Sequence, residues 1–323
     1  MNLRVLKPPP AEDESRPFVV ACVRNEVLRL PAFLKHYRRL GIEEFHVIDN
    51  DSDDGTAEYL GTQSDVALYT TRQSYAEARC GKDWINEVIE AHGADRWILT
   101  VDADELFIFP GFETLPIRGL CRYLDESGKE AMVALMIDMY SSGSIGSVSY
   151  SPGDDLIEAC PFFDPHSYSA PSEQYLGLPV RGGPRGRLFD FERFPSPFLG
   201  KIPLVRWRAG HSYQGSTHRL EGFERARVTG ALLHFKFLQD FGPRALIESR
   251  REEHWSSATE YKSYQRKLHQ DPSLSFYCDR SVRFESSSQL VGLGLMKAPD
   301  SYLRRLEELR GSGPDEPSHS SCY

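Results

Sequence analysis

Apolar and polar residues form a repeating pattern over the first hundred positions. Short apolar runs predict buried strands at residues 18–23, 45–49, 66–70 and 97–101. Between them, apolar residues spaced three and four apart predict helices at residues 26–40 and 75–92, each followed by a glycine, and a short helix at residues 54–60. Strands that alternate with helices predict an α/β fold with a mostly parallel sheet covered by helices on both faces.

Beyond residue 110 the pattern is less regular. One more apolar strand is predicted at residues 132–137, and an amphipathic helix at residues 258–269. Residues 1–16 are rich in proline and acidic residues and are expected to form a loose arm, and residues 311–323 a disordered tail. The stretch from about residue 140 to 204 reads as mostly irregular.

Composition narrows the class of protein. The 323 residues are 40% hydrophobic, which supports a substantial core, and the net charge of −9 argues against nucleic acid as a partner. No apolar run reaches the length of a membrane span, and the N-terminus lacks the apolar core of a secretion signal. The six cysteines are scattered, without the paired spacing of a zinc site or a disulfide framework. We therefore expect a reduced, soluble, cytoplasmic protein.

The most informative polar sequence is Asp102-Ala103-Asp104-Glu105, which lies between two apolar runs. Because residues two apart in an extended chain point the same way, Asp102 and Asp104 can converge on one point. Two convergent carboxylates suit a hard cation such as Mn²⁺ or Mg²⁺. An isolated Asp-x-Asp is more often a surface acid cluster, but the apolar flanks and the preceding elements favour a functional site here.

Polar residues also follow the first two predicted strands, at the sheet edge where ligands of parallel α/β proteins bind. Asn25 and Glu26 follow the first strand. The alternative to a functional role is that Asn25 caps the next helix and Glu26 is an acidic residue of its first turn. Asp49 and Asp51 come at the end of the second strand, where a functional role is favoured. Binding of a dinucleotide such as NAD or FAD is not expected, because no Gly-x-Gly-x-x-Gly follows the first strand. A haloacid-dehalogenase-like phosphatase would place its Asp-x-Asp after the first strand rather than the fourth.

Three segments in this order resemble the nucleotide-sugar glycosyltransferases of the GT-A fold, in particular family 2-like and family 92-like enzymes. The segments are residues 18–26, 49–56 and 101–105. The resemblance covers residues 17–240 and implies a nucleotide-binding half (17–110), an acceptor half (111–240) and a helical C-terminal extension (241–310). It implies that Asn25, Glu26, Asp49 and Asp51 line a nucleotide pocket, and that Asp102 and Asp104 contact the metal or the ribose.

Residues of the second half extend the resemblance. Ser141-Ser142-Gly143-Ser144, Lys201, His218 and the sequence 232–237 stand where family 92-like enzymes have a Ser/Gly loop, a lysine, a histidine and a late histidine motif. By that likeness His234 is a metal ligand together with Asp102 and Asp104, and Lys236 and Lys201 contact the donor. A core histidine on an alternating strand is the other reading of His234, and the role of His211 stays open.

Several cations could serve an anionic ligand. The segment 181–208 is rich in arginine, and it either clamps a diphosphate or an anionic acceptor or forms a solvated basic face. Arg79 and Lys82 fall about one turn apart on the predicted third helix and could contact the donor, although ordinary helix surface is the alternative.

The sequence thus predicts a metal-dependent transferase that moves a sugar from a nucleoside-diphosphate sugar, with UDP-sugar favoured, to a hydroxyl acceptor such as a glycan. Inversion is implied only by the resemblance, and it requires a general base. The candidates are Asp138, which ends a predicted strand, Asp164 and Glu173. Two alternatives stay open: a metal-dependent phosphoesterase that uses the same acids, and a non-catalytic relative that binds nucleotides or carbohydrates.

Overall fold

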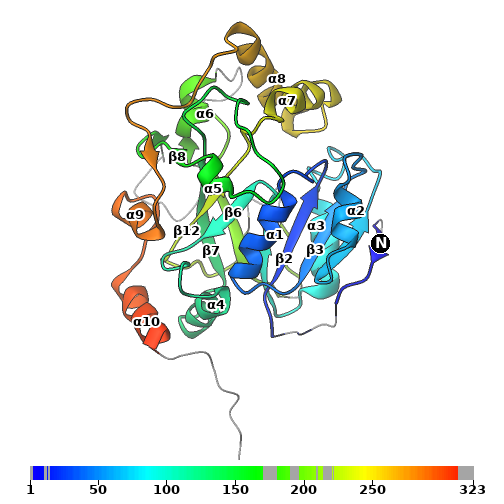
Figure 1. The fold of residues 1–323 in the computed structure, drawn as a ribbon. Coiled ribbons are helices and arrows are strands. Elements are labelled where there is room, and N and C mark those ends of the chain that lie inside the picture. The colour runs from blue at the N-terminus through cyan, green and yellow to red at the C-terminus, as the bar shows by residue number, and fades with distance from the viewer. Residues whose placement is uncertain are drawn as a thin grey trace, which may run out of the picture.

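The chain is organised around a nine-stranded sheet (Figure 1). The computed structural model describes residues 3–10, 13, 15–169, 180–189, 196–208, 210–213, 220 and 222–311. In order across the sheet, the strands are β1 (Arg4–Lys7), β4 (Val66–Thr70), β3 (Phe45–Asp49), β2 (Phe18–Val23), β5 (Trp97–Thr100), β11 (Gly200–Arg206), β7 (Ala131–Asp138), β12 (Gly230–His234) and β6 (Glu105–Ile108).

Six of the nine strands of this sheet run in the same direction. The strands β4, β3, β2 and β5 pair in parallel, and so do β7 and β12. Because β11 is antiparallel to both of its neighbours, β5 and β7, these two strands point the same way. The edge strands β1 and β6 are antiparallel to their partners. The carboxyl ends of six strands and the starts of β11 and β6 therefore meet at one edge of the sheet.

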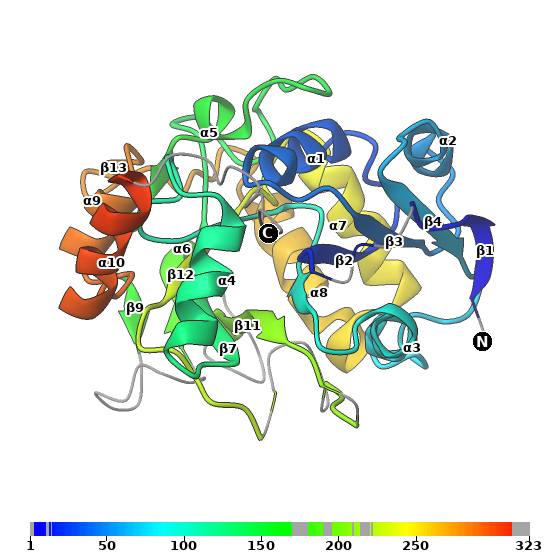
Figure 2. The ribbon, with the colours of Figure 1, turned by 90° about the horizontal axis from the view of Figure 1, so that it is seen from below.

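Helices cover both faces of this sheet. Side chains of β2 alternate: Val19, Ala21 and Val23 pack in an apolar cluster with α1 (Leu30–Arg39) and α4 (Ile117–Glu126). Phe18 and Val20 pack in a second cluster with α3 (Lys82–His92). Figure 2 shows α1 and α3 on opposite sides of β2 and β3. The predicted α/β sheet flanked by helices is confirmed.

The remaining elements lie around the second half of the sheet. The helices α7 (Phe241–Arg251) and α8 (Trp255–Gln270) pack on each other and project beyond the sheet edge (Figure 1). The other elements are α2 (Thr56–Gly61), α5 (Leu156–Ala159), α6 (Gly183–Leu188), α9 (Ser287–Gly292), α10 (Asp300–Gly311), β8 (Phe162–Phe163), β9 (Tyr168–Ser169), β10 (Arg181–Gly182) and β13 (Val282–Arg283). None of the helices in the described ranges has the length and apolar character needed to cross a bilayer.

Several segments differ from the sequence-based expectation. Residues 4–7, expected in a loose arm, form β1 and pair with β4. The first predicted helix starts at Leu30 rather than at residue 26, because residues 26–29 form a turn after Asn25, whose φ is 54°. The third predicted helix starts at Lys82, since Arg79, Cys80 and Gly81 all have positive φ and break the helical path. Residues 312–323 of the expected tail lie outside the described residues.

Candidate functional site

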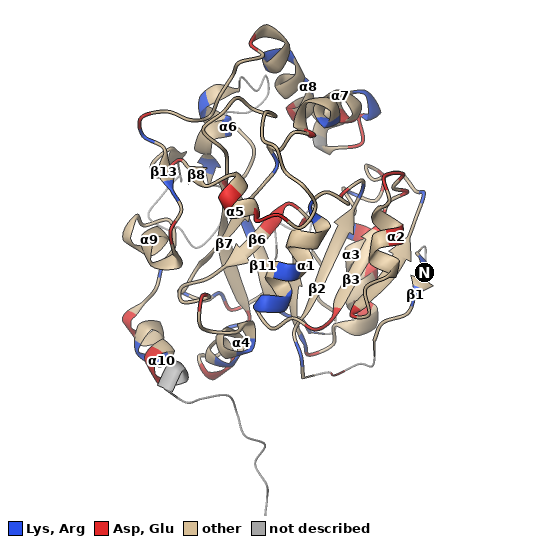
Figure 3. Cartoon of the chain, in the orientation of Figure 1, with Lys and Arg blue, Asp and Glu red and all other residues tan. Residues whose placement is uncertain are grey.

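Charged side chains gather at the edge of the sheet where six strands end. Figure 3 shows acidic positions at the start of β6 and beyond β3, with basic positions among them. The residues at this edge come from strands far apart in sequence: Asp49 ends β3, Asp102 follows β5, Glu105 begins β6, Asp138 ends β7, Lys201 lies at the start of β11 and His234 ends β12. The edge therefore brings together most of the residues that the sequence predicted for one site.

His234 lies at the centre of this group. Its backbone is in register with Asp138 on one side and Glu105 on the other, so the three side chains point to the same face. The imidazole Nδ1 lies 2.6 Å from Asp138 Oδ1, and Nε2 lies 3.2 Å from Asp104 Oδ2. Burial opposes a charge on the ring, but the carboxylates of Asp104 and Asp138 outweigh it and raise the pKa of His234 to about 9.

The first carboxylate of the Asp-x-Asp motif has a different partner. Lys201 places its ammonium Nζ 2.6 Å from Asp102 Oδ2 and 2.6 Å from Glu105 Oε1. The other oxygen of Glu105 accepts a hydrogen bond from the Asp102 backbone N–H. Burial opposes the lysine charge, yet the Asp102 and Glu105 carboxylates outweigh it and raise the pKa of Lys201. Lys201 is therefore a buried ammonium ion within the motif.

A second group of charges lies behind Asp138. The Arg185 Nε donates to Asp138 Oδ2 at 2.8 Å, so both oxygens of this fully buried carboxylate have partners. Arg185 also donates to Glu260 of α8, and Lys236 Nζ lies 3.4 Å from the same Glu260 oxygen. The pKa of Asp138 is lowered, because Arg185 and His234 outweigh the effect of burial. Asp138, the predicted general base, is thus held between Arg185 and His234.

The residues predicted for the nucleotide lie around the ends of β2 and β3. The Asn25 amide bridges to Asp53 by two hydrogen bonds, and buried Glu26 forms ion pairs with Arg29 and Arg244. The predicted Asp51 is half exposed and forms an ion pair with the exposed Arg72, 3.0 Å away.

Asp49 differs from these neighbours. One carboxylate oxygen, Oδ2, accepts a hydrogen bond from the Ser52 backbone N–H at 3.3 Å. The other, Oδ1, is buried and has no hydrogen-bond partner among the described residues. Burial raises the pKa of this carboxyl group. A buried acceptor without a donor is uncommon in folded proteins, and it is the arrangement expected where a ligand supplies the missing N–H or O–H.

Arg79 and Lys82 do not join the site as a pair on one helical turn. Arg79 precedes α3, is exposed and forms an ion pair with Asp83. Lys82 is the first residue of α3, and its buried ammonium lies 3.7 Å from the same Asp83 carboxylate. Burial lowers the pKa of Lys82. The described contacts of both residues are with Asp83 rather than with the carboxylates of the sheet edge.

Three further candidates from the sequence can be placed only in part. Asp164 is buried, and its carboxylate accepts hydrogen bonds from Arg187 and from the Tyr140 hydroxyl. Glu173 and His218 lie outside the described residues. The arginine-rich segment 181–208 is spread among separate partners: Arg185 and Arg187 bind carboxylates, and Arg206 and Arg208 lie near Asp125 and Glu130.

Sequence reasoning missed Arg29, which joins the donor side to the His234 side. Its guanidinium is 1% exposed and binds Asp240 through two hydrogen bonds of 2.7 and 2.8 Å. It also donates to the backbone carbonyls of Phe235 and Lys236 at 3.0 and 3.2 Å. Arg29 thus fixes the chain directly after His234. An arginine at the start of an amphipathic helix looks like ordinary surface, so no sequence pattern signals this role.

The three side chains predicted as metal ligands are Asp102, Asp104 and His234. Among the described residues, no three His, Cys, Asp or Glu side chains are arranged to hold a metal ion. In two of the three predicted ligands, the atoms that could bind a metal lie 3.2 Å apart, namely Asp104 Oδ2 and His234 Nε2. Asp138 on the far side of the ring matches the carboxylate that commonly orients a metal-binding histidine. Of the three predicted ligands, Asp104 and His234 thus lie side by side, whereas Asp102 forms an ion pair with Lys201.

Comparison with known proteins gives one distant sequence relative. No protein-family model matches the chain. A glycosyltransferase family 92 protein of Oryza sativa subsp. japonica is 28% identical over 98 residues, which are 30% of this chain and 17% of that protein. The matched part is thus a small share of the relative's length. This relative supports a relationship to glycosyltransferases.

Solved structures resemble the chain only weakly. A mannosyltransferase from Pyrobaculum calidifontis, in complex with GDP-Man and Mn²⁺, is 16% identical with a TM-score of 0.28, over 48% of this chain and 49% of that one. A UDP-glucose pyrophosphorylase from Acinetobacter baumannii is 9% identical with a TM-score of 0.29, over 79% and 99% of the two chains. Neither likeness is close enough to bear on function.

Proposed function

We propose that this protein is a glycosyltransferase that moves a sugar from a nucleoside-diphosphate sugar, with UDP-sugar as the favoured donor, to a hydroxyl of a glycan or similar acceptor. We further propose that it uses Mn²⁺ or Mg²⁺ and inverts the configuration of the sugar carbon. The observation that carries the proposal is the meeting of Asp49, Asp104 and His234 at one sheet edge. The family 92 relative supports the same reaction class.

The nucleoside is assigned to the side of Asp49. Its buried Oδ1 has no donor among the described residues, and a buried acceptor left without a hydrogen bond costs about 1–3 kcal/mol. An N–H of the base or a hydroxyl of the ribose would provide that hydrogen bond. Asn25 and Glu26 border the same loops and fix them through their contacts with Asp53 and Arg244.

The diphosphate is assigned to the side of Asp104 and His234, which would hold the divalent ion. When bound, the ion supplies positive charge to the leaving diphosphate. Lys236, whose ammonium lies 4.6 Å from the ring centre of Tyr261, adds a second cation on this side. Negative charge that develops on the leaving group is stabilised by cations fixed in place before the reaction.

Asp138 has a positioning role in this proposal rather than the role of the base. It receives the Nδ1–H of His234 and so fixes the ring with Nε2 directed toward Asp104. Arg185 in turn fixes Asp138. This chain of contacts orients the proposed ligand without bringing Asp138 to the substrate.

The experiment combines a donor panel with two variants. Purified protein is tested for Mn²⁺-dependent binding of UDP, GDP and CDP, and for release of the nucleotide from the matching sugar donors. Asp104→Asn should lower turnover on the order of 100-fold, and Asp49→Asn should weaken nucleotide binding at least about tenfold while the protein stays folded. Chelation of the metal should lower turnover of the wild type.

Asp65→Asn is the matched control, because Asp65 precedes β4 at the opposite edge of the sheet and its carboxylate binds the exposed Arg38. It should keep wild-type turnover. Hydrolysis of simple phosphoesters in place of sugar transfer would identify a phosphoesterase. Nucleotide binding without turnover of any donor would identify a binding protein. The stereochemistry of the product tests inversion.

A further inference from the structure

The side chain of Lys201 lies between two carboxylates of the Asp-x-Asp-Glu motif, a contact that the sequence did not reveal. The strand β11 runs antiparallel to β5 and β7, so its start reaches the edge where those strands end. The Lys201 side chain is 5% exposed, and Asp102 and Glu105 each lie 2.6 Å from its ammonium. Three groups from β11, the β5–β6 loop and β6 thus form one ion cluster, in which Lys201 and Glu105 are buried and Asp102 reaches the surface.

The carboxylates of Glu105 and Asp102 both already hold a cation, the Lys201 ammonium. Glu105 is fully buried, with one oxygen on Lys201 and the other on the Asp102 backbone N–H. Asp102 gives one oxygen to Lys201, and its side chain is 55% exposed. A divalent ion bound to Asp102 would lie close to the Lys201 ammonium, and the two like charges would repel each other.

We propose that the ammonium of Lys201 is the resident cation of this motif, that Asp102 and Glu105 serve to hold it, and that the divalent ion binds through Asp104 and His234 without Asp102. One part of this proposal rests on the proposed function: the anion that contacts both Lys201 and the metal ion is the diphosphate of the donor. Lys201 then presents a fixed positive charge to that anion, beside the exchangeable divalent ion.

The test measures Mn²⁺ affinity of the full-length protein without any nucleotide, by titration followed by electron paramagnetic resonance. Lys201→Met should bind Mn²⁺ at least about tenfold more tightly than the wild type, because it frees two carboxylates beside Asp104. Lys201→Arg, which keeps the charge, should stay within about threefold of the wild type. Lys129→Met removes a lysine charge that pairs with Glu224, away from the motif, and should change nothing.

The aspartate variants supply a second arm. Asp104→Asn should abolish Mn²⁺ binding, whereas Asp102→Asn should leave the affinity within about threefold of the wild type. Unchanged or weaker binding by folded Lys201→Met would overturn the proposal, and so would an equal loss in Asp102→Asn and Asp104→Asn. If Lys201→Met does not fold, Lys201→Gln replaces it. No donor or transfer step enters this titration, so its result stands whether or not the protein proves to be a glycosyltransferase.

Discussion

A single side chain, the guanidinium of Arg29, connects the two halves of the candidate site. It lies between the β2–α1 loop, which carries Glu26, and the chain after His234. Its two hydrogen bonds to Asp240 and its two to backbone carbonyls use the forked shape of the side chain. A lysine has a single ammonium and cannot make the same set of bonds.

Arg29→Lys should therefore lower the free energy of unfolding by about 2–3 kcal/mol, because buried carbonyls and part of Asp240 lose their donors. Arg38→Lys is the matched control. Arg38 also binds a carboxylate, Asp65, through two nitrogens, but its side chain is 38% exposed and the loss should stay below about 1 kcal/mol. Urea denaturation of both variants provides the measurement. Equal losses in the two would contradict the account given for Arg29.

The residues of the site divide into those that sequence can predict and those that it cannot. Asp49, Asp104 and His234 come at strand ends, and the geometry of parallel sheets places such residues at a common edge. Arg29 and Arg185 reach the site from a turn and from the short helix α6, so only the three-dimensional path of the chain reveals them. The partner of Asp102 was equally hidden, because Lys201 is 99 residues away in the sequence.

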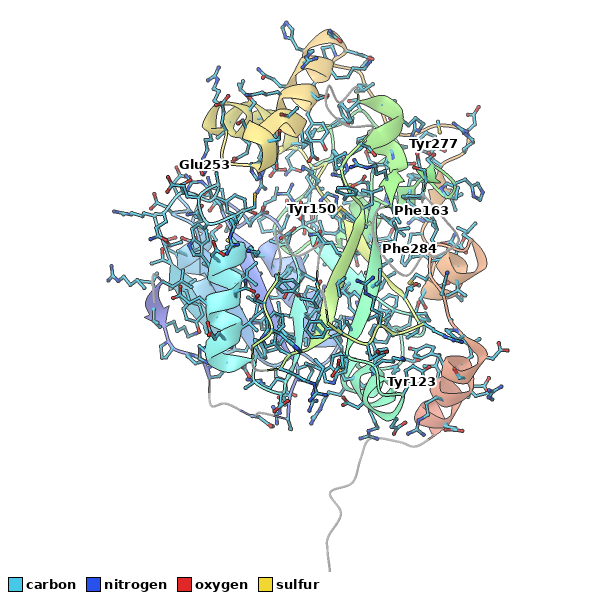
Figure 4. All side chains as sticks on the ribbon, turned by 180° about the vertical axis from the view of Figure 1, so that it is seen from behind. Tyr123, Tyr150, Phe163, Glu253, Tyr277 and Phe284 are labelled. Atoms are coloured by element: carbon cyan, nitrogen blue, oxygen red, sulfur yellow. The ribbon has the colours of Figure 1, made fainter. Side chains whose placement is uncertain are left out.

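At the scale of elements, the segment before α3 shows how tertiary contacts override local pattern. The amphipathic spacing of residues 75–92 predicted one helix, but residues 79–81 have positive φ and α3 begins at Lys82. Glu253, labelled in Figure 4, accepts hydrogen bonds from the Ser74 hydroxyl and the Ala76 backbone N–H. The turn between α7 and α8 thus holds this segment in a non-helical path, a contact that no local sequence pattern encodes.

The same turn depends on an ionised carboxylate. Glu248 in α7 lies 2.8 Å from Arg251 and 3.1 Å from His254. Burial raises the pKa of Glu248, but His254 and Arg251 outweigh burial and lower it to about 2 from the ordinary value of 4.5. Because the folded-state pKa is depressed, the stabilisation is fully present above about pH 4.5 and is lost as the pH falls toward 2.

Glu248→Gln should therefore reduce the free energy of unfolding by about 1–2 kcal/mol at pH 7, after allowance for the solvent that reaches both partners. The difference between wild type and variant should shrink steadily as the pH falls from about 4.5 toward 2, a range that follows from the two pKa values. Denaturant titrations at several pH values test this. A difference that stays constant over that range would show that the charge of Glu248 does not contribute.

At the scale of the whole molecule, apolar clusters tie the C-terminal residues to the sheet. One cluster joins Tyr140, Phe189 and Phe237 to residues of α7, α8 and the following loop, including Phe241, Tyr264 and Phe276. Another includes Tyr302 of α10, whose hydroxyl donates to the Pro110 carbonyl. The family resemblance implied a transferase domain at residues 17–240 followed by a helical extension at residues 241–310, and these clusters join the two segments. Local sequence pattern does not reveal such contacts between segments that are far apart in the chain.

These clusters lead to a prediction about truncation. A chain that ends at residue 240 loses Phe241, Tyr261, Tyr264, Phe276 and Tyr302, all of them buried. Full burial of one such side chain contributes about 1.5–3 kcal/mol, so the summed loss rivals the 5–15 kcal/mol by which whole domains are stable. The truncated chain should lack cooperative thermal unfolding, whereas a chain that ends at residue 311 should unfold like the full-length protein. Circular dichroism during heating distinguishes the two. Cooperative unfolding of the shorter chain would mean that residues 241–311 are a separable extension and that the aromatic cluster is dispensable for the fold.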